Sequence, residues 1–388
     1  MLTKLSQNPK DTAFVQHPYR FYAKAHAAGS AFWWNDYDWP VACGYGLVNA
    51  MLRDRRLGRP NPNATERPAH LAPFYAVDDL SLLELEGEAH SRLRRLITKV
   101  FTNRSIAAMA PFVEQLAHQL IDEMQSGDDL LTKFCEPIPV LTIAKMLNVP
   151  VERAPDLLRW SHEMVAMYQF GRTRAVEDRA VAATQAFSAY LHDLIAERRR
   201  APGKDLLSAL IAEGDLSESE IIATIILVLN AGHEASVHAF GNGIHAILLA
   251  NGDTKEWMAA ENIEGTVEEI LRFDPPLHMF TRYAYEDVEI GPLSLKRGEI
   301  VGLCLGAAAH DPSKFDMPEV FNPLRYDPGH ISFGAGAHFC LGAVLARTEL
   351  RTALPILFDR LPNLKLAIQS TYADRYHFRG LTALNVEC

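Results

Sequence analysis

The sequence predicts a mainly helical fold with a small β-rich part. Between residues 105 and 250, apolar side chains recur at helical spacing over several long stretches. Helices are expected over residues 108–124, 130–147, 155–170, 176–200 and 217–249, and again over 343–354. The strands are shorter. Residues 31–34 and 39–43 indicate two strands with a turn between them, and residues 287–303 alternate around glycine turns typical of small hairpins.

Length and composition are those of a globular protein. The chain has 388 residues, of which 48% are hydrophobic and 22% charged, and we expect one domain over residues 1–388. The formal net charge of −10 argues against a nucleic-acid partner, which would need a basic surface. Five cysteines without a repeated spacing indicate no disulfide framework, so a reducing cytoplasm is expected.

No segment indicates export or membrane insertion. The first nine residues lack the apolar core of a signal peptide. The longest apolar run, residues 221–229, is far too short to cross a bilayer. We therefore expect a cytoplasmic monomer with no membrane partner.

The most informative stretch is the glycine-rich run from Phe333 to Gly342. Glycines are costly inside helices and strands, so three within ten residues predict a tight loop that can lie against something flat. Directly after Gly342 the pattern becomes helical. Cys340 is therefore expected where a loop enters a helix N-terminus, a position that stabilises a thiolate.

Cys340 has three interpretations from its neighbourhood alone. A lone cysteine is often a buried structural residue, although burial does not require the glycines around it. His338 lies two residues away, so a cysteine–histidine nucleophile is open. The third interpretation is a single axial thiolate ligand to haem iron. Zinc is disfavoured, because no second Cys or His stands at ligand spacing.

The helix expected over residues 217–249 carries a polar interruption. Ser217 and Glu220 form a capping box, and residues 221–229 are apolar nearly all round, which indicates a buried helix. Its middle then places Gly232 beside Glu234, and both are costly in a buried helix. Either the glycine packs against a neighbouring helix and the glutamate is ion-paired, or the helix opens locally for a flat ligand and a small molecule.

Residues 88–101 indicate a basic helix. His90 and Arg94, four residues apart, share one side and suit a pair of carboxylates. Arg92, Arg95 and Lys99 lie on the opposite side, where a solvated face is the ordinary account. A docking surface for an electron donor is the functional alternative.

Together these motifs resemble the cytochrome P-450 superfamily. The run Phe333-x-x-Gly336-x-x-x-Cys340-x-Gly342 is similar to its haem-binding signature. Ala231-Gly232-x-Glu234 is similar to its oxygen-activating segment, with Ala235 where the family usually has threonine, followed by Ser236. Three further residues resemble its Glu-x-x-Arg and later arginine, namely Glu269, Arg272 and Arg325, which in the family fix the fold around the cysteine loop.

The resemblance implies a P-450 fold around a buried haem b and a monooxygenase reaction. Cys340 would be the iron ligand, and Glu234, supported by Ser236, would move protons towards dioxygen. Further residues would contact the haem: His90, Arg94, Arg282 and His338 at the propionates, and Ala231, Gly232, Phe333, Gly334 and Gly342 around the ring. Electrons would come from NAD(P)H through a ferredoxin and its reductase. A haem protein without this activity, a peroxide-using variant and a cysteine–histidine hydrolase remain alternatives.

The substrate is expected to be a hydrophobic small molecule. The candidate lining residues are Phe74, Tyr75, Met164, Met167, Leu227, Leu277, Met279 and Phe280. Phe74 and Tyr75 belong to residues 59–80, where four prolines predict a long irregular loop. Core packing is the ordinary account of the methionines, and a surface loop tucked on the core is the ordinary account of Phe74 and Tyr75.

Overall fold

The computed structural model describes residues 1–64, 66–168, 172–325 and 329–388. The chain forms two compact units, each considered by itself below. Unit 1 comprises Met1–Asn63, Glu114–Glu136 and Ala235–Cys388, and unit 2 comprises Ala64–Val113 and Pro137–Glu234. Helices α7 (Ala110–Asp122) and α12 (Glu218–Ala250) each contribute residues to both units. The expectation of a single domain stays a prediction.

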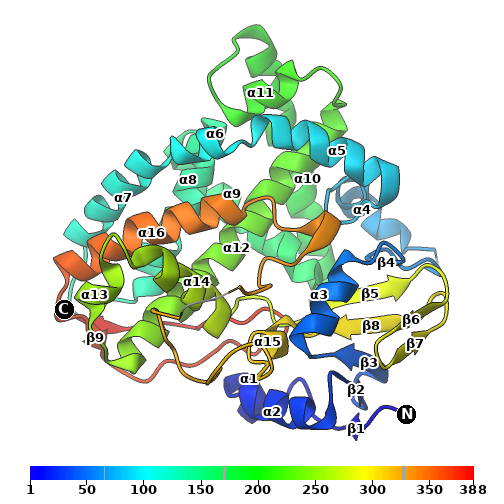
Figure 1. The fold of residues 1–388 in the computed structure, drawn as a ribbon. Coiled ribbons are helices and arrows are strands. Elements are labelled where there is room, and N and C mark those ends of the chain that lie inside the picture. Colours follow the sequence, from blue (N-terminus) through cyan, green and yellow to red (C-terminus); the bar gives the residue numbers. More distant parts are fainter. Residues whose placement is uncertain (65, 169–171, 326–328) are drawn as a thin grey trace. The chain divides into compact units, whose positions relative to one another are not determined.

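Unit 1 contains all the strands of the described chain (Figure 1). Its sheet has the order β1-β2-β3-β8-β5-β4, with bounds β1 Lys4–Leu5, β2 Ala31–Trp34, β3 Trp39–Ala42, β4 Leu57–Gly58, β5 Phe280–Ala284 and β8 Ile300–Leu303. Two short two-stranded sheets pair β6 (Val288–Ile290) with β7 (Leu293–Leu295), and β9 (Lys365–Leu366) with β10 (Val386–Glu387). The strands and hairpins expected from the sequence are thus confirmed.

The helices of unit 1 come from several separate stretches of the chain. They are α1 Thr12–Gln16, α2 Tyr19–Ala28, α3 Tyr45–Arg53, α13 Thr254–Met258, α14 Ile263–Phe273, α15 Leu305–Ala308, the 3-10 turn η5 Gly336–His338 and α16 Ala343–Arg360. Strand β5 pairs antiparallel with β8, so that Phe280 faces Leu303 and Arg282 faces Val301. One apolar core of unit 1 collects aromatic residues from α1, α2 and β2 around Met279.

Helices are the only regular secondary structure among the described residues of unit 2 (Figure 1). Besides its parts of α7 and α12 it contains η1 Ala69–Leu71, α4 Ala72–Asp78, α5 Gly87–Val100, α6 Asn103–Ala107, α8 Pro137–Leu147, η3 Val151–Arg153, α9 Ala154–Val165, η4 Ala166–Tyr168, α10 Arg174–Arg200 and α11 Leu206–Ala212. The expected helix over 155–170 ends with η4, and Phe170 lies outside the described residues.

Two element boundaries differ from the sequence expectation. Residues 59–80 are not irregular throughout, because they include η1 and α4. Proline is tolerated in the first turn of a helix, and Pro73 stands there in α4. The expected helix over 130–147 is a π-helical turn, Leu131–Cys135, followed by α8, which starts at Pro137. Proline has no backbone N–H, so it favours a new helix start over continuation.

Helix α12 begins as expected. The Glu220 carboxylate accepts from the Ser217 backbone N–H at 2.8 Å, and the Glu220 N–H donates to the Ser217 hydroxyl at 3.2 Å, which completes the capping box. In length and composition α12 could cross a membrane, but 56% of its most apolar window is buried inside the protein. Such burial is that of a core helix.

Candidate functional site

The Cys340 loop is shaped by two glycines in the left-handed region. Gly334 and Gly336 both have φ of 70°, which residues with a Cβ rarely adopt. The Cys340 N–H donates to the Phe333 carbonyl at 2.9 Å and closes the loop. A Cβ at Gly336 would lie 2.6 Å from the Leu52 carbonyl oxygen, so the loop lies directly against the end of α3.

The Cys340 thiol differs from the other cysteines in its surroundings. It is half-buried and stands two residues before Gly342, the N-cap of the 18-residue helix α16. Unpaired N–H groups and the helix dipole favour a thiolate at such a position. Burial instead raises the pKa of the Cys43, Cys135 and Cys304 thiols, which disfavours their ionisation. Compared with these three buried thiols, Cys340 has surroundings that suit a thiolate, and its role as a ligand stays a prediction.

Four residues on one side of α12 are not fully buried. Leu227, Ala235 and His238 are half-buried and Ala231 is exposed, although it stands in the middle of a long core helix. Residues spaced by three or four share one helix side. Small side chains at 231 and 235 leave this side of the helix without bulky groups, and a role for it in haem binding stays a prediction.

Gly232 supports the packing interpretation as well. A Cβ at this position would lie 2.9 Å from Cδ1 of Ile143 on α8, so the glycine allows close helix approach in unit 2. Glu234, two residues on, is buried. The polar interruption of α12 therefore combines a helix-packing glycine with a buried carboxyl.

Ser236 faces helix α16. It is buried, and its side chain is close enough to Glu349 to affect that carboxyl. Burial raises the pKa of Glu349 to about 8, and Ser236 opposes part of this rise. Glu349 is therefore neutral at pH 7. The sequence analysis missed this residue, although a single glutamate within the helix expected over residues 343–354 was a usable signal.

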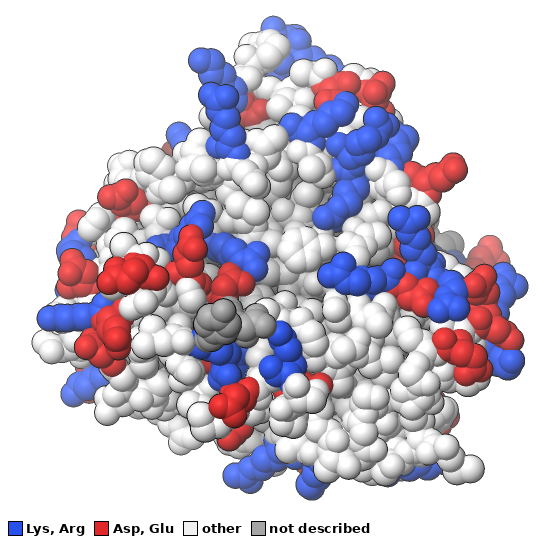
Figure 2. Space-filling view, viewed as in Figure 1, with Lys and Arg blue, Asp and Glu red and all other residues white. Residues whose placement is uncertain are grey.

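Helix α5 places the expected pair on one side. His90 is 3% exposed and Arg94 is half-buried. On the other side, Arg92 pairs with Glu220 and Lys99 with Glu213, whereas Arg95 is exposed. Figure 2 shows basic side chains gathered over α5 and the adjacent α11, with acidic ones among them. The basic face is thus partly neutralised by neighbouring carboxylates.

The β5 region lies next to the Cys340 loop. A Cβ at Gly334 would lie 3.9 Å from the Phe280 ring, and the Arg282 guanidinium is 5.6 Å from the centre of that ring. Arg282 is buried and donates to the Thr281 carbonyl at 2.9 Å. Phe280 is half-buried, as is Leu277 just before the strand, whereas Met279 is packed within the aromatic core.

The Cys340 loop also contacts helix α16 through the Arg347 side chain. The Arg347 guanidinium lies 4.6 Å from the centre of the Phe333 ring. It also pairs with Glu268 at 2.5 Å, which fixes it between α14 and the loop. His338, in η5, is half-buried. Arg347 therefore connects Phe333, at the start of the Cys340 loop, to helices α14 and α16.

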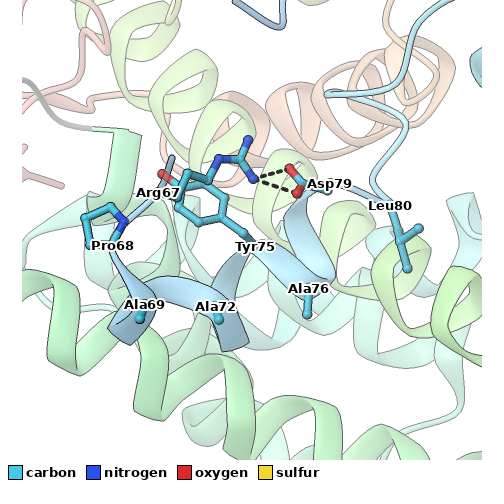
Figure 3. A pocket seen from close by; sticks show the side chains of 8 residues that line it. All are labelled: Arg67, Pro68, Ala69, Ala72, Tyr75, Ala76, Asp79 and Leu80. Carbon is cyan, nitrogen blue, oxygen red and sulfur yellow. Dashed lines mark hydrogen bonds and ion pairs between the residues drawn. The ribbon is translucent and has the colours of Figure 1, made fainter. Parts of the chain in front are cut away.

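The pocket candidates of unit 2 are mostly core residues. Phe74, Met164 and Met167 are buried, which fits the packing account, so their role at a substrate stays a prediction. Tyr75 instead lines an open hollow of about 420 Å³ on α4 (Figure 3). There Arg67 covers the Tyr75 ring at 3.7 Å and donates to both Asp79 oxygens at 2.6 Å.

A buried cluster of ion pairs connects helix α14 to the segment that contains Arg325. Glu269 and Arg272 are fully buried on α14 and pair at 2.7 Å, and Arg325 reaches Glu269 at 3.2 Å. Arg272 also donates to the Ala309 and Pro318 carbonyls at 2.8 and 3.0 Å. This arrangement matches the structural role that the resemblance implied.

Comparison with known proteins decides the family. The sequence pattern of the cytochrome P450 family matches residues 261–363. A biotin biosynthesis cytochrome P450 of Bacillus subtilis is 32% identical over 98% of this chain and 99% of its own length. The chain belongs to the cytochrome P450 superfamily. Another P450, 6-deoxyerythronolide B hydroxylase of Saccharopolyspora erythraea, is 38% identical over 85% of this chain and 84% of its own.

Solved P450 structures confirm the fold. P450BioI, crystallised with an acyl carrier protein carrying hexadec-9Z-enoic acid, has a TM-score of 0.92 and 31% identity, covering 97% of this chain and 99% of that one. Bacillaene polyketide synthase P450 PksS of Bacillus subtilis gives 0.89 at 30% identity, covering 98% and 99%. The chain is thus an oxidoreductase of the P450 monooxygenase class, and the hydrolase alternative has no support.

Proposed function

We propose that the protein is a haem-thiolate monooxygenase that inserts one atom of dioxygen into a hydrophobic small organic substrate. The observation that carries this proposal is the half-exposed Cys340 at the N-terminus of α16, in a loop shaped by Gly334 and Gly336. Electrons would come from NAD(P)H through a ferredoxin and its reductase. One similar structure, P450BioI, was crystallised with an acyl carrier protein carrying hexadec-9Z-enoic acid, which supports an apolar substrate.

Haem b fits the donors of the chain. Cys340 would bind the iron, and the propionates would meet the nitrogen donors of His90, Arg94, Arg282 and His338. Ala231, Gly232, Phe333, Gly334 and Gly342 would border the ring. When bound, haem iron supplies the activation of dioxygen. We expect a cytoplasmic monomer that binds no membrane.

The chain's own task is to deliver protons and exclude water. Glu234, buried on α12, would pass protons towards dioxygen through an ordered water. Ala235 has no hydroxyl, so Ser236 would support this path from its place near Glu349. The alternative is a haem protein without monooxygenase activity or a peroxide user. Product formation with NAD(P)H, ferredoxin and reductase, compared with peroxide alone, separates these functions.

Replacing Glu234 by glutamine should lower turnover by roughly two orders of magnitude, the usual size of a proton-transfer contribution. Ser236→Ala should mainly lower the fraction of NAD(P)H that ends in product and raise peroxide release. Product and peroxide per NAD(P)H are the measurements. Turnover at the wild-type rate in Glu234→Gln would exclude proton transfer by Glu234. If Ser236→Ala converts the same fraction of NAD(P)H into product as the wild type, water or the substrate is the hydrogen-bond donor instead of Ser236.

Glu349 should make stability fall with rising pH. Its folded-state pKa of about 8 exceeds the ordinary glutamate value of about 4.3, so the folded protein holds a proton that the unfolded chain releases. Between those pH values its contribution should fall by up to about 1.4 kcal/mol per pH unit. Urea unfolding of wild type and Glu349→Gln at several pH values measures this dependence.

The glutamine variant should show a shallower decline than the wild type. Glu261→Gln, at an exposed residue, is the matched control and should keep the wild-type dependence. Equal slopes for wild type and Glu349→Gln would contradict a buried neutral carboxyl.

Electron-donor docking should depend on Arg95 more than on its neighbours. Arg92 and Lys99 are already paired with carboxylates, whereas Arg95 is exposed on the same side of α5. Arg95→Glu should slow reduction by an acidic ferredoxin several-fold at low salt, through association. Stopped-flow reduction at varied salt measures this effect. Arg200→Glu, at an exposed residue at the end of α10, is the charge-matched control. Equal reduction rates for the wild type, Arg95→Glu and Arg200→Glu would show that the basic side of α5 does not dock the electron donor.

A further inference from the structure

A buried tyrosine–histidine–aspartate arrangement lies in unit 1, and the mechanism above does not use it. The Tyr22 hydroxyl, from α2, is 2.7 Å from Nδ1 of His278. Nε2 of the same ring lies 3.7 Å from the Asp274 carboxylate, at the end of α14. All three side chains are buried. The imidazole therefore stands between a phenol and an acid group, with one ring nitrogen turned to each.

The surroundings decide where the imidazole proton resides. Arg379 donates to Asp274 at 2.6 Å and Tyr372 donates at 2.7 Å. Burial alone would raise the pKa of Asp274, but the Arg379 charge and the hydrogen bonds of His278 and Tyr19 lower the pKa by more, so the carboxylate is ionised. The N–H of a neutral His278 is then best placed on Nε2, facing that charge. Nδ1 is then left as an acceptor 2.7 Å from the Tyr22 hydroxyl, which can give its proton either to this nitrogen or to the Tyr376 hydroxyl at 3.1 Å.

A second pair of the same kind lies in the same core. The Tyr37 hydroxyl is 2.7 Å from Nε2 of His377. Burial lowers the pKa of His377 to about 4, so this imidazole is neutral as well. A neutral imidazole hydrogen-bonded to a phenol is the partner that accepts the phenolic proton when an electron leaves the ring.

Oxidisable rings connect the two pairs. The Tyr22 and Tyr376 hydroxyls are 3.1 Å apart, and the Tyr376 ring centre is 5.5 Å from that of Trp34. Trp34 lies 5.0 Å from Tyr37, which stacks on Trp39 at 4.8 Å. Trp39 is half-buried. An unbroken row of tyrosines and tryptophans therefore runs from Tyr22 to the surface of unit 1.

The inner end of the row lies close to the Cys340 loop. His278 stands two residues before Phe280, whose ring lies against Gly334. Met279, between them, packs in the same core as Tyr22 and Tyr376. The chain from His278 to Phe280 therefore connects the row to the Cys340 loop.

We propose that Tyr22 is a redox-active tyrosine that protects the enzyme when hydrogen peroxide is reduced at the haem without substrate. The proposal rests on the proposed function, because it needs the haem. Reduction of one peroxide to two water molecules consumes two electrons and two protons. Tyr22 supplies one electron, the haem would supply the other, and two protons are taken up from the solvent. The phenolic proton moves to Nδ1 of His278, which leaves a neutral tyrosyl radical and an imidazolium facing Asp274.

The radical is then repaired from outside. A thiol or ascorbate in solution gives one electron at Trp39, and the row of rings carries it inward to Tyr22. The proton returns from His278 to the phenolate oxygen. A second reductant molecule returns, by the same route, the electron that the haem would have supplied. The net result is the reduction of one peroxide to two water molecules by two one-electron reductant molecules, which together release the two protons consumed, in place of damage to the haem or its surroundings.

Electron paramagnetic resonance of the haem-loaded enzyme, frozen rapidly after peroxide addition, tests the proposal. The protein carries ring-deuterated tyrosine, so that a narrowed signal identifies a tyrosyl radical. Tyr22→Phe, which removes one oxygen, should lose most of this signal and bleach the haem Soret band several-fold faster. His278→Gln should lose the signal although Tyr22 is present. Trp39→Phe should prolong the radical in the presence of ascorbate.

Tyr190→Phe, at a tyrosine of α10 in unit 2, is the matched control and should resemble the wild type. The carbon monoxide spectrum of each variant is recorded first. Without a thiolate band in the wild type, the proposed function fails. With the band present, a wild-type radical signal in either Tyr22→Phe or His278→Gln overturns the assignment of Tyr22 and its proton acceptor.

Discussion

Cys340→Ala should abolish the red-shifted Soret band that the reduced, carbon monoxide-treated wild type is expected to show. That band requires a thiolate on the iron, and Cys340 combines partial exposure with a helix N-terminus and a glycine-shaped loop. Product formation should be lost with it. The visible spectrum of the purified variant after haem reconstitution, with and without carbon monoxide, is the measurement.

The other cysteines provide the controls. Cys43→Ala and Cys388→Ala should both keep the band, since Cys43 is buried in the core of unit 1 and Cys388 is the exposed last residue. A thiolate band that survives in Cys340→Ala would refute the assignment. Absence of the band in the wild type itself would refute the haem-thiolate proposal altogether.

Arg272→Met should destabilise the protein by about 3–5 kcal/mol, the usual cost of leaving one charge of a buried pair without its partner. The Glu269 carboxylate would remain fully buried, with only Arg325 as a compensating cation. Two backbone carbonyls would also lose their Arg272 donor. The shift of the urea unfolding midpoint measures the effect.

The double variant Glu269→Gln/Arg272→Met should recover part of this loss, because it removes the orphaned charge as well. Arg325→Met should cost less than Arg272→Met, since its side chain is partly exposed. Equal stability of Arg272→Met and the wild type would contradict a buried ion pair at this place.

Short sequence patterns predicted the elements that depend on interactions between residues close together in the chain. The capping box at Ser217 and Glu220, the helix after Gly342 and the short strands were visible because turn residues and apolar periodicity act over a few positions. The same holds for the Cys340 loop, where the spacing of glycines reports backbone conformation directly.

Contacts between distant segments could not be predicted in this way. Tyr22 and His278 are 256 positions apart, and Tyr376 approaches Tyr22 from 354 positions away. No short window relates such residues, so a tyrosine in an aromatic stretch looks like any core residue. The pairing of Arg92 and Lys99 with carboxylates beyond their own helix was hidden for the same reason, and a helix side that looks basic in sequence is partly neutral in the fold.

The contact between Gly336 and the end of α3 bears on how the enzyme is assembled. A side chain at this position would meet backbone atoms of Leu52 and Arg53, at 2.6 and 2.9 Å, and backbone cannot move aside as a flexible side chain does. The close backbone contact therefore requires glycine at this position, whether or not a cofactor is bound. The loop that carries Cys340 can be shaped before the prosthetic group arrives, so that haem would enter a site whose ligand is already in position.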